Sequence, residues 1–261
     1  MKTFPRMSLA LLSVLSLFAC RISLAAPDAA PQEGAASRRM VVAIPDYLQT
    51  NGVVSVKRSM TEALLAAGLL PVALPEMDDS AADEFLARCD AVMVGGGIGE
   101  QDYERRCAYE DRILKLAVKR GLTVVGICHG CQRINHCFGG TLAYVPEEVA
   151  LVHKDVPLRL RTGLMAEHFV TVAPGGSLMA AVFGEGRLQV NSSHKRCCGE
   201  VAPGFRVTAV SEGDGVIEAI EHETLPIYGF QFHPEQYWRK DPRFLELIRL
   251  AFTGRRGAES F

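Results

Sequence analysis

The chain has 261 residues, of which 48% are hydrophobic and 22% are charged, and its formal net charge is −2. This composition excludes a disordered chain, and the absence of a basic face or a Lys/Arg run argues against a nucleic-acid partner. The length and composition suit one α/β domain with a full core.

The first 38 residues differ in character from the rest of the chain. Lys2 and Arg6 precede an apolar stretch at residues 7–19, and Ser23-Leu24-Ala25 forms a small-x-small cleavage pattern. This order is typical of a secretory signal peptide, and the apolar stretch is shorter than the about 20 residues that span a bilayer. We predict a signal peptide at residues 1–25, a flexible leader at residues 26–38, and export to a bacterial periplasm or secretion.

Two other interpretations of this N-terminus stay open. Leu17-Phe18-Ala19-Cys20 loosely resembles a bacterial lipoprotein processing site, in which Cys20 would carry a lipid anchor, although Phe18 fits that pattern poorly. A buried N-terminal helix is the second interpretation. Soluble export without a membrane span is the preferred prediction.

From residue 40 onward, short apolar runs alternate with helical patterns. Strands are expected at residues 40–44, 71–74, 91–94 and 123–127, and helices at residues 61–67, 81–88, 104–120 and 129–138. Later strands are expected at residues 168–172, 187–190, 206–210, 216–220 and 227–232, with a closing helix at residues 242–252. Asp214-Gly215 is a strong hairpin signal between two of these strands. The pattern predicts one α/β domain with a mostly parallel central sheet, flanked by helices, and an antiparallel C-terminal portion.

Residues 124–132, VVGICHGCQ, join a predicted strand to a predicted helix through the pattern G-x-C-x-G. This pattern is the cysteine form of a nucleophile elbow, a turn so sharp that the residues flanking the nucleophile must be small. The N–H groups of the following helix would face the sulfur of Cys128 and favour its thiolate form. The backbone N–H of His129 would then be placed for an oxyanion hole.

A candidate base lies at the end of a later predicted strand, in Gln231-Phe232-His233-Pro234-Glu235. The ends of parallel strands meet at one edge of a sheet, where ligands bind. An imidazole with a carboxylate two residues later matches the arrangement of a nucleophile, a base and an orienting acid.

Residues 40–252 resemble the class I glutamine amidotransferase-like superfamily, and most of all its γ-glutamyl-γ-aminobutyrate hydrolase and γ-glutamyl hydrolase branch. The matching stretches, in chain order, are Gly95-Gly96-Gly97, GICHGCQRIN with GGTL, VNSSH at 190–194, DGVIEAIE at 214–221 and GFQFHPE at 229–235. The resemblance implies a flavodoxin-like fold of the glutamine amidotransferase type at residues 39–254, followed by a tail at residues 255–261.

The resemblance also implies the site residues. It implies a triad of Cys128 as nucleophile, His233 as base and Glu235 as its orienter. The oxyanion hole would use backbone N–H groups of Gly96 or Gly97 and of His129. The substrate-binding residues it implies are Gln132, Asn191, Ser192 and His194. No metal and no cofactor are expected.

The chain departs from the hydrolase pattern near the pocket. His129 stands where Arg is common, Lys195-Arg196 stand where a second His and a Gln are usual, and Cys107 stands where an acid is common. The stretch from Gly97 to the Arg106/Glu110 pair is also shorter than usual. These departures concern the substrate more than the chemistry.

Five other functions are compatible with parts of the sequence. A PfpI-like cysteine protein would lack the late His-Pro-Glu, and a thioredoxin-like use of Cys128 and Cys131 would leave the later motifs unexplained. Metal binding by Cys128, Cys131 and His136 would need a tetrahedral arrangement, and no second C-x-x-C supports it. A synthase-coupled amidotransferase would need a partner domain to use the ammonia. A PfpI-like cysteine protein and a catalytically silent exported binding protein stay alternatives.

The remaining cysteines and histidines allow only general expectations. Without Cys20 the number of cysteines is odd, which leaves at least one thiol free or paired between chains. The pairing is left open among Cys89, Cys107, Cys131, Cys137, Cys197 and Cys198. His153, His168 and His222 are interpreted as surface or loop histidines, with a structural role for His168.

The sequence therefore predicts an exported cysteine hydrolase that cleaves a γ-glutamyl amide, or a similar small amide, through a thioester on Cys128. Its partner is a small γ-glutamyl substrate. The positive charges of Lys195 and Arg196 favour an acidic leaving group. The oligomeric state is not determined by these patterns.

Overall fold

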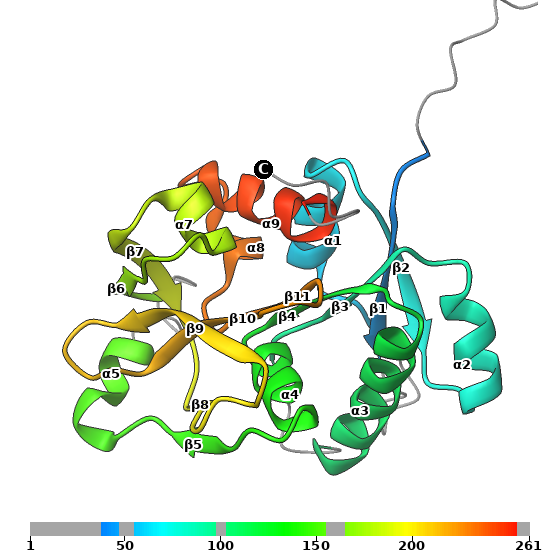
Figure 1. The fold of residues 1–261 in the computed structure, drawn as a ribbon, viewed down its shortest axis with the longest axis horizontal. Coiled ribbons are helices and arrows are strands. Elements are labelled where there is room, and N and C mark those ends of the chain that lie inside the picture. Colours follow the sequence, from blue (N-terminus) through cyan, green and yellow to red (C-terminus); the bar gives the residue numbers. More distant parts are fainter. Residues whose placement is uncertain (1–37, 47–54, 98–102, 155–164, 255–261) are drawn as a thin grey trace, which may run out of the picture. The chain divides into compact units, whose positions relative to one another are not determined.

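In a computed structural model, residues 38–46, 55–97, 103–154 and 165–254 are described, and their strands form one mixed sheet (Figure 1). Its parallel part consists of β1 (Val41–Asp46), β2 (Leu70–Pro75), β3 (Ala91–Val94), β4 (Thr123–Ile127) and β11 (Ile227–Phe230). The order β2-β1-β3-β4-β11 confirms the predicted parallel sheet. These strands are rich in Val, Ile and Ala, and β3 and β4 are buried throughout, as expected for strands covered on both faces.

The antiparallel part extends the sheet beyond β11 in the order β10-β9-β6-β7. It consists of β10 (Ile217–His222), β9 (Phe205–Ser211), β6 (Ala166–Val172) and β7 (Gly186–Ser192). Strands β9 and β10 form the predicted hairpin, in which Asp214 Oδ1 accepts a hydrogen bond from Val216 N and Gly215 has a positive φ. The antiparallel C-terminal portion is thus confirmed.

Helices cover both faces of the sheet (Figure 1). One face carries α1 (Arg58–Ala66), α7 (Leu178–Phe183), α8 (Pro234–Tyr237) and α9 (Arg243–Thr253), and the other carries α2 (Asp79–Leu86), α3 (Tyr103–Lys119) and α4 (His129–Cys137). Each layer has its own apolar core: Leu64, Phe244 and Leu247 lie in the first, and Leu86, Ile113 and Ile134 lie in the second. Two packed layers on one sheet make this a single α/β domain.

Several short elements were not predicted from the sequence. They are β5 (Leu142–Tyr144), β8 (Arg196–Cys198), the 3₁₀ helix η1 (Glu147–Val149), and helices α5 (Ala150–His153), α7 and α8. Strand β8 pairs with β5 and with Ile217 of β10. Elements of three to six residues carry too little periodicity to be recognised, and tertiary contacts stabilise them here.

The predicted signal peptide, leader, Cys20 anchor and C-terminal tail fall outside the described residues, apart from Arg38 of the leader. Residues 39–261 group as one unit. Among the described helices, none combines the length and the apolar character needed to cross a bilayer.

Candidate active site

Cys128 lies in a strained turn between β4 and α4. Its φ of 52° and ψ of −102° make it the one non-glycine residue with a positive φ among the described residues. Such a conformation costs on the order of 1–3 kcal/mol and is concentrated at functional sites. The turn therefore has the geometry of a nucleophile elbow.

The glycines at both sides of Cys128 are required by close backbone contacts. A Cβ on Gly126 would lie 2.5 Å from the carbonyl group of Gly130, and a Cβ on Gly130 would lie 2.0 Å from the carbonyl oxygen of Val94. Neither site can hold a side chain without a shift of backbone. The G-x-C-x-G spacing is thus a steric consequence of the turn.

His233 and Glu235 lie at the same edge of the sheet as Cys128. Strands β11 and β4 are parallel neighbours, with Phe230 opposite Ile127, and Cys128 N donates a hydrogen bond of 2.7 Å to the Phe230 carbonyl. The Nδ1 of His233 lies 2.9 Å from Oε1 of Glu235, and both side chains are buried. With Nδ1 engaged by the carboxylate, Nε2 of His233 is the nitrogen available to another group.

The surroundings of Gly96 show that Cys128 and His233 lie beside one another. A Cβ built on Gly96 would lie 2.8 Å from Cε1 of His233 and 3.0 Å from Cβ of Cys128. The two side chains therefore border the same small space, and the glycine loop after β3 closes it.

Charge in this space favours a protonated His233. Burial alone would lower the pKa of His233, but the charges of Glu235 and Cys128 outweigh burial and raise it to about 10. Burial likewise opposes ionisation of Glu235, but the charge and hydrogen bond of His233 lower the pKa of this carboxyl. The geometry thus supports a protonated imidazole beside the sulfur of Cys128, oriented by the carboxylate of Glu235.

Asn191 holds the backbone of His233 from β7. Its Nδ2 donates to the carbonyl of His233 at 3.0 Å, and its Oδ1 accepts from the N–H of His233 at 3.0 Å. The amide side chain therefore fixes the segment that carries the imidazole. This positioning contact was not predicted from the sequence, because it joins residues 42 positions apart.

A chain of hydrogen bonds connects the glycine loop to His129, the residue after Cys128. Arg106 on α3 donates to the carbonyl of Gly95 at 3.1 Å and to that of Gly97, and its Nε lies 2.8 Å from Oε1 of Glu110. The other oxygen of Glu110 lies 2.7 Å from Nε2 of His129. The three predicted oxyanion residues, Gly96, Gly97 and His129, are thus on two segments linked by Arg106 and Glu110.

His129 is buried against Glu110 and does not extend into solvent. Burial lowers the pKa of His129 in spite of the neighbouring carboxylate. Burial opposes the charge of Glu110, but the hydrogen bond with His129 and the charge of Arg106 lower the pKa of Glu110. A neutral His129 that donates Nε2–H to an ionised Glu110 satisfies these contacts.

The four residues predicted to bind substrate are buried and contact the protein itself. Gln132 Nε2 donates to the Arg196 carbonyl at 2.7 Å, and Ser192 Oγ donates to the His153 carbonyl at 2.8 Å. Asn191 contacts His233, and His194 Nε2 lies 3.3 Å from Oε1 of Glu218. Their contact with a substrate stays a prediction.

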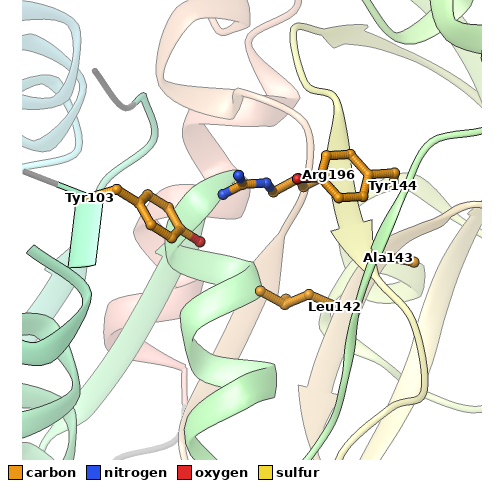
Figure 2. A pocket seen from close by; sticks show the side chains of 5 residues that line it. All are labelled: Tyr103, Leu142, Ala143, Tyr144 and Arg196. Carbon is orange, nitrogen blue, oxygen red and sulfur yellow. The ribbon is translucent and has the colours of Figure 1, made fainter. Parts of the chain in front are cut away.

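A pocket of about 250 Å³ lies beside the start of α4 (Figure 2). Its lining residues are Tyr103, Leu142, Ala143, Tyr144 and Arg196. The guanidinium of Arg196 lies 4.6 Å from the ring centre of Tyr103 and 5.4 Å from that of Tyr144, and Figure 2 shows it between the two rings. The ring of Tyr103 also lies 5.9 Å from that of His129. A cationic, aromatic pocket therefore adjoins His129.

The described cysteines, Cys89 to Cys198, are free thiols. Cys131 is fully buried, and its sulfur lies 3.9 Å from that of Cys198. The hydrogen bond with Cys198, together with burial, raises the pKa of the Cys131 thiol. Cys131 thus extends into the core of the α2–α4 layer, beside Ile134.

Two histidines were misassigned from the sequence. His153 and His168 are buried, whereas we expected surface or loop residues. The alternation of β6 carried a usable signal, since His168 has the same phase as the buried Val170 and Val172. For His153 no such periodicity was present, and its burial depends on tertiary contacts.

Comparison with known proteins agrees with this geometry. The peptidase C26 family model matches residues 40–235. Protein NtpR of Enterococcus hirae is 27% identical over 224 residues, which cover 78% of this chain and 91% of that protein. The glutamine-hydrolysing GMP synthase of Anaplasma marginale is 31% identical over 166 residues, 62% of this chain and 28% of that synthase. A crystal structure of a glutamine amidotransferase from Thermotoga maritima shares the fold, with a TM-score of 0.54, 16% identity, and coverage of 84% of this chain and 87% of that chain.

Proposed function

The chain belongs to the peptidase C26 family and is a cysteine-dependent amide hydrolase by type, and we propose that it is an exported hydrolase of γ-glutamyl amides with an acidic leaving group. The observation that best supports cysteine-dependent hydrolysis is the strained turn at Cys128 beside the His233–Glu235 pair. The motifs of the γ-glutamyl hydrolase branch support the γ-glutamyl part, and the N-terminal pattern supports export.

The mechanism follows from the roles that the geometry allows. The thiolate of Cys128 attacks the amide carbon, and the developing oxyanion accepts hydrogen bonds from backbone N–H groups of His129 and of Gly96 or Gly97. His233, protonated at Nε2, gives this proton to the departing amine as the C–N bond breaks, which leaves an acyl-thioester. Glu235 holds the imidazole through Nδ1 in both steps.

Water completes the cycle. The neutral His233 accepts a proton from water, which attacks the thioester carbon and releases the γ-carboxylic acid of glutamate. The C–S bond breaks in this step, and the thiolate of Cys128 and the protonated His233 are restored. The released acid loses its proton to solvent.

Arg196 supports an acidic leaving group. It lines the pocket beside the start of α4, and the rings of Tyr103 and Tyr144 lie near its guanidinium. A guanidinium with aromatic neighbours is suited to bind a carboxylate. Lys195, the second cation of the predicted pair, is exposed and is not among the residues that line this pocket.

The test compares three γ-glutamyl amides whose leaving groups are glutamate, ethylamine and putrescine. We expect the highest kcat/KM for the glutamate derivative, and loss of all three activities in Cys128→Ala. In Arg196→Leu, loss of a hydrogen bond to a charged group, about 1.5–3 kcal/mol, predicts a roughly 10- to 150-fold fall in kcat/KM for the acidic substrate alone.

Lys195→Leu is the matched control, because it removes the same charge from the neighbouring exposed position. It should leave the preference unchanged. A higher kcat/KM for the ethylamine or putrescine derivative would contradict the acidic leaving group. Full activity of Cys128→Ala would contradict the nucleophile itself.

A further inference from the structure

A cluster of three histidines and a glutamate lies in the antiparallel half of the domain. His153 ends α5, His168 lies on β6, His194 follows β7 and Glu218 lies on β10. All four side chains are buried, and one potential ligand atom from each lies within 4.8 Å of the others. The proposed chemical steps of hydrolysis use none of these side chains, although His194 is also a predicted substrate-binding residue.

The outer ring nitrogen of each histidine faces a hydrogen-bond acceptor. His153 Nε2 lies 3.0 Å from Asp214 Oδ2, His194 Nδ1 lies 3.1 Å from the Arg196 carbonyl, and His168 Nδ1 lies 3.3 Å from the Phe169 carbonyl. A carbonyl or a carboxylate requires an N–H at that nitrogen. The inner nitrogen of each neutral ring therefore directs a lone pair toward Glu218. Histidines that bind a metal are commonly oriented by such outer contacts.

The inner atoms have the spacing of a tetrahedral metal site. Oε1 of Glu218 lies 3.3 Å from His194 Nε2, 3.4 Å from His153 Nδ1 and 3.4 Å from His168 Nε2. His153 Nδ1 also lies 3.3 Å from His194 Nε2. A zinc ion bound at about 2.0–2.1 Å separates neighbouring tetrahedral ligands by about 3.3 Å. Four of the six edges of the tetrahedron thus match this spacing.

Hydrogen bonds within the cluster do not satisfy these atoms. Among the described residues, neither oxygen of Glu218 has a hydrogen-bond partner, and neither has His168 Nε2. A buried carboxylate that faces three imidazole nitrogens without a hydrogen bond to any of them is unfavourable unless a positive charge compensates it. Protons on all three histidines would place like charges beside one another, because the ring of His153 lies 4.6 Å from that of His168 and 4.8 Å from that of His194. A single cation in the centre would compensate the carboxylate and accept all three lone pairs.

We propose that His153, His168, His194 and Glu218 form a structural site for a divalent transition-metal cation of the Zn²⁺ type. Three imidazoles and one carboxylate are borderline ligands that suit this ion, and four protein ligands close the coordination shell. The ion would join α5, β6, the segment after β7 and β10. It would stabilise the folded protein and would not take part in hydrolysis of the amide substrate. The sequence alone predicts no metal, so this proposed site departs from that prediction.

The experiment measures metal uptake by the full-length protein purified without a histidine tag. After loading with Zn²⁺ and dialysis, elemental analysis should find about one equivalent per chain. Co²⁺ loading should give the visible absorption of a tetrahedral site without a thiolate charge-transfer band, since no cysteine is a ligand. A thousandfold excess of Zn²⁺ over its Kd should raise Tm by roughly 10 °C relative to the chelator-treated protein.

Glu218→Gln and His168→Ala should lose the bound metal and the Tm shift. Two controls should keep both: His136→Ala, which removes an exposed histidine, and Cys128→Ala, which removes the proposed nucleophile. Metal retention in Cys128→Ala separates this site from the proposed hydrolysis. If the cluster variants do not fold, metal uptake and the Co²⁺ spectrum of the wild-type protein still show whether the metal site exists. A wild-type protein that takes up neither ion, or binds them through thiolates, would overturn the proposal.

Discussion

A methyl group added to Gly96 is expected to separate Cys128 and His233, the proposed nucleophile and acid–base, without removing any atom of either. The Cβ of Gly96→Ala would lie 2.8 Å from Cε1 of His233 and 3.0 Å from Cβ of Cys128. Unstrained carbon atoms approach to about 3.5–4.0 Å, so one group must move by roughly 0.7 Å or more. The cysteine Cβ is fixed to the strained turn, and His233 is therefore the group that moves. The backbone N–H of residue 96 remains available in this variant.

The expected loss follows from this displacement. A misplacement of about 1 Å in a catalytic group costs on the order of 10²-fold in rate, or about 2.7 kcal/mol. We therefore expect kcat/KM of Gly96→Ala to fall by about two orders of magnitude, mostly in kcat. Asn191 holds the backbone of His233, and Glu235 holds its ring. The displaced imidazole therefore cannot easily readjust to a productive position beside Cys128.

The assay is steady-state hydrolysis of a γ-glutamyl amide, combined with the rate of Cys128 alkylation by iodoacetamide and with Tm. Gly95→Ala is the matched control in the same loop. Its Cβ would meet the Sδ and Cε atoms of Met60, the flexible end of a side chain, and neither Cys128 nor His233. We expect near wild-type rates for the control. Gly96→Ala with wild-type kcat/KM would refute the placement of Gly96 between the two residues.

Two further predictions concern protonation and oxidation. The pKa of His233 is raised to about 10. Its protonated form, and the stability that its ion pair with Glu235 contributes to the fold, are therefore fully present below pH 6.5 and are lost as the pH rises through about 10. Hydrolysis should therefore fall through that range, and Glu235→Gln should move the fall to lower pH; an alkaline limb at the same pH in both proteins would contradict this assignment. The sulfur of Cys131 lies 3.9 Å from that of Cys198, so a thiol oxidant should crosslink Cys131 to Cys198 rather than to Cys128. The hydrogen bond with Cys198 and burial raise the pKa of Cys131, so this crosslinking should be slow. Mass spectrometry of peptides from the oxidised protein measures this, and a Cys128–Cys131 crosslink would be the opposite result.

The elbow and the later His-Pro-Glu could be recognised because their constraints are local. Gly126 and Gly130 are near each other in sequence as well as in space, so the steric demand of the turn is visible in the spacing itself. His233 and Glu235 are two residues apart, and their hydrogen bond is a short-range feature. The parallel strands were predicted for a similar reason, since each is a continuous apolar run.

Contacts between distant segments were not predictable in this way. Asn191 reaches the backbone of His233 across 42 positions, and Arg106 reaches Gly97 from another element. Strands β5 and β8 exist as a pair, and neither has enough residues to show an alternating pattern alone.

By itself, the sequence determined the alternation of strands and helices, the position of the nucleophile turn and the residues that form the His233–Glu235 pair. Only the tertiary structure decided which polar side chains become buried together. His153, His168, His194 and Glu218 come from four different elements and converge because β6, β9 and β10 lie side by side. The energy that selects such a cluster depends on distances between remote segments, and those distances exist only once the sheet has formed.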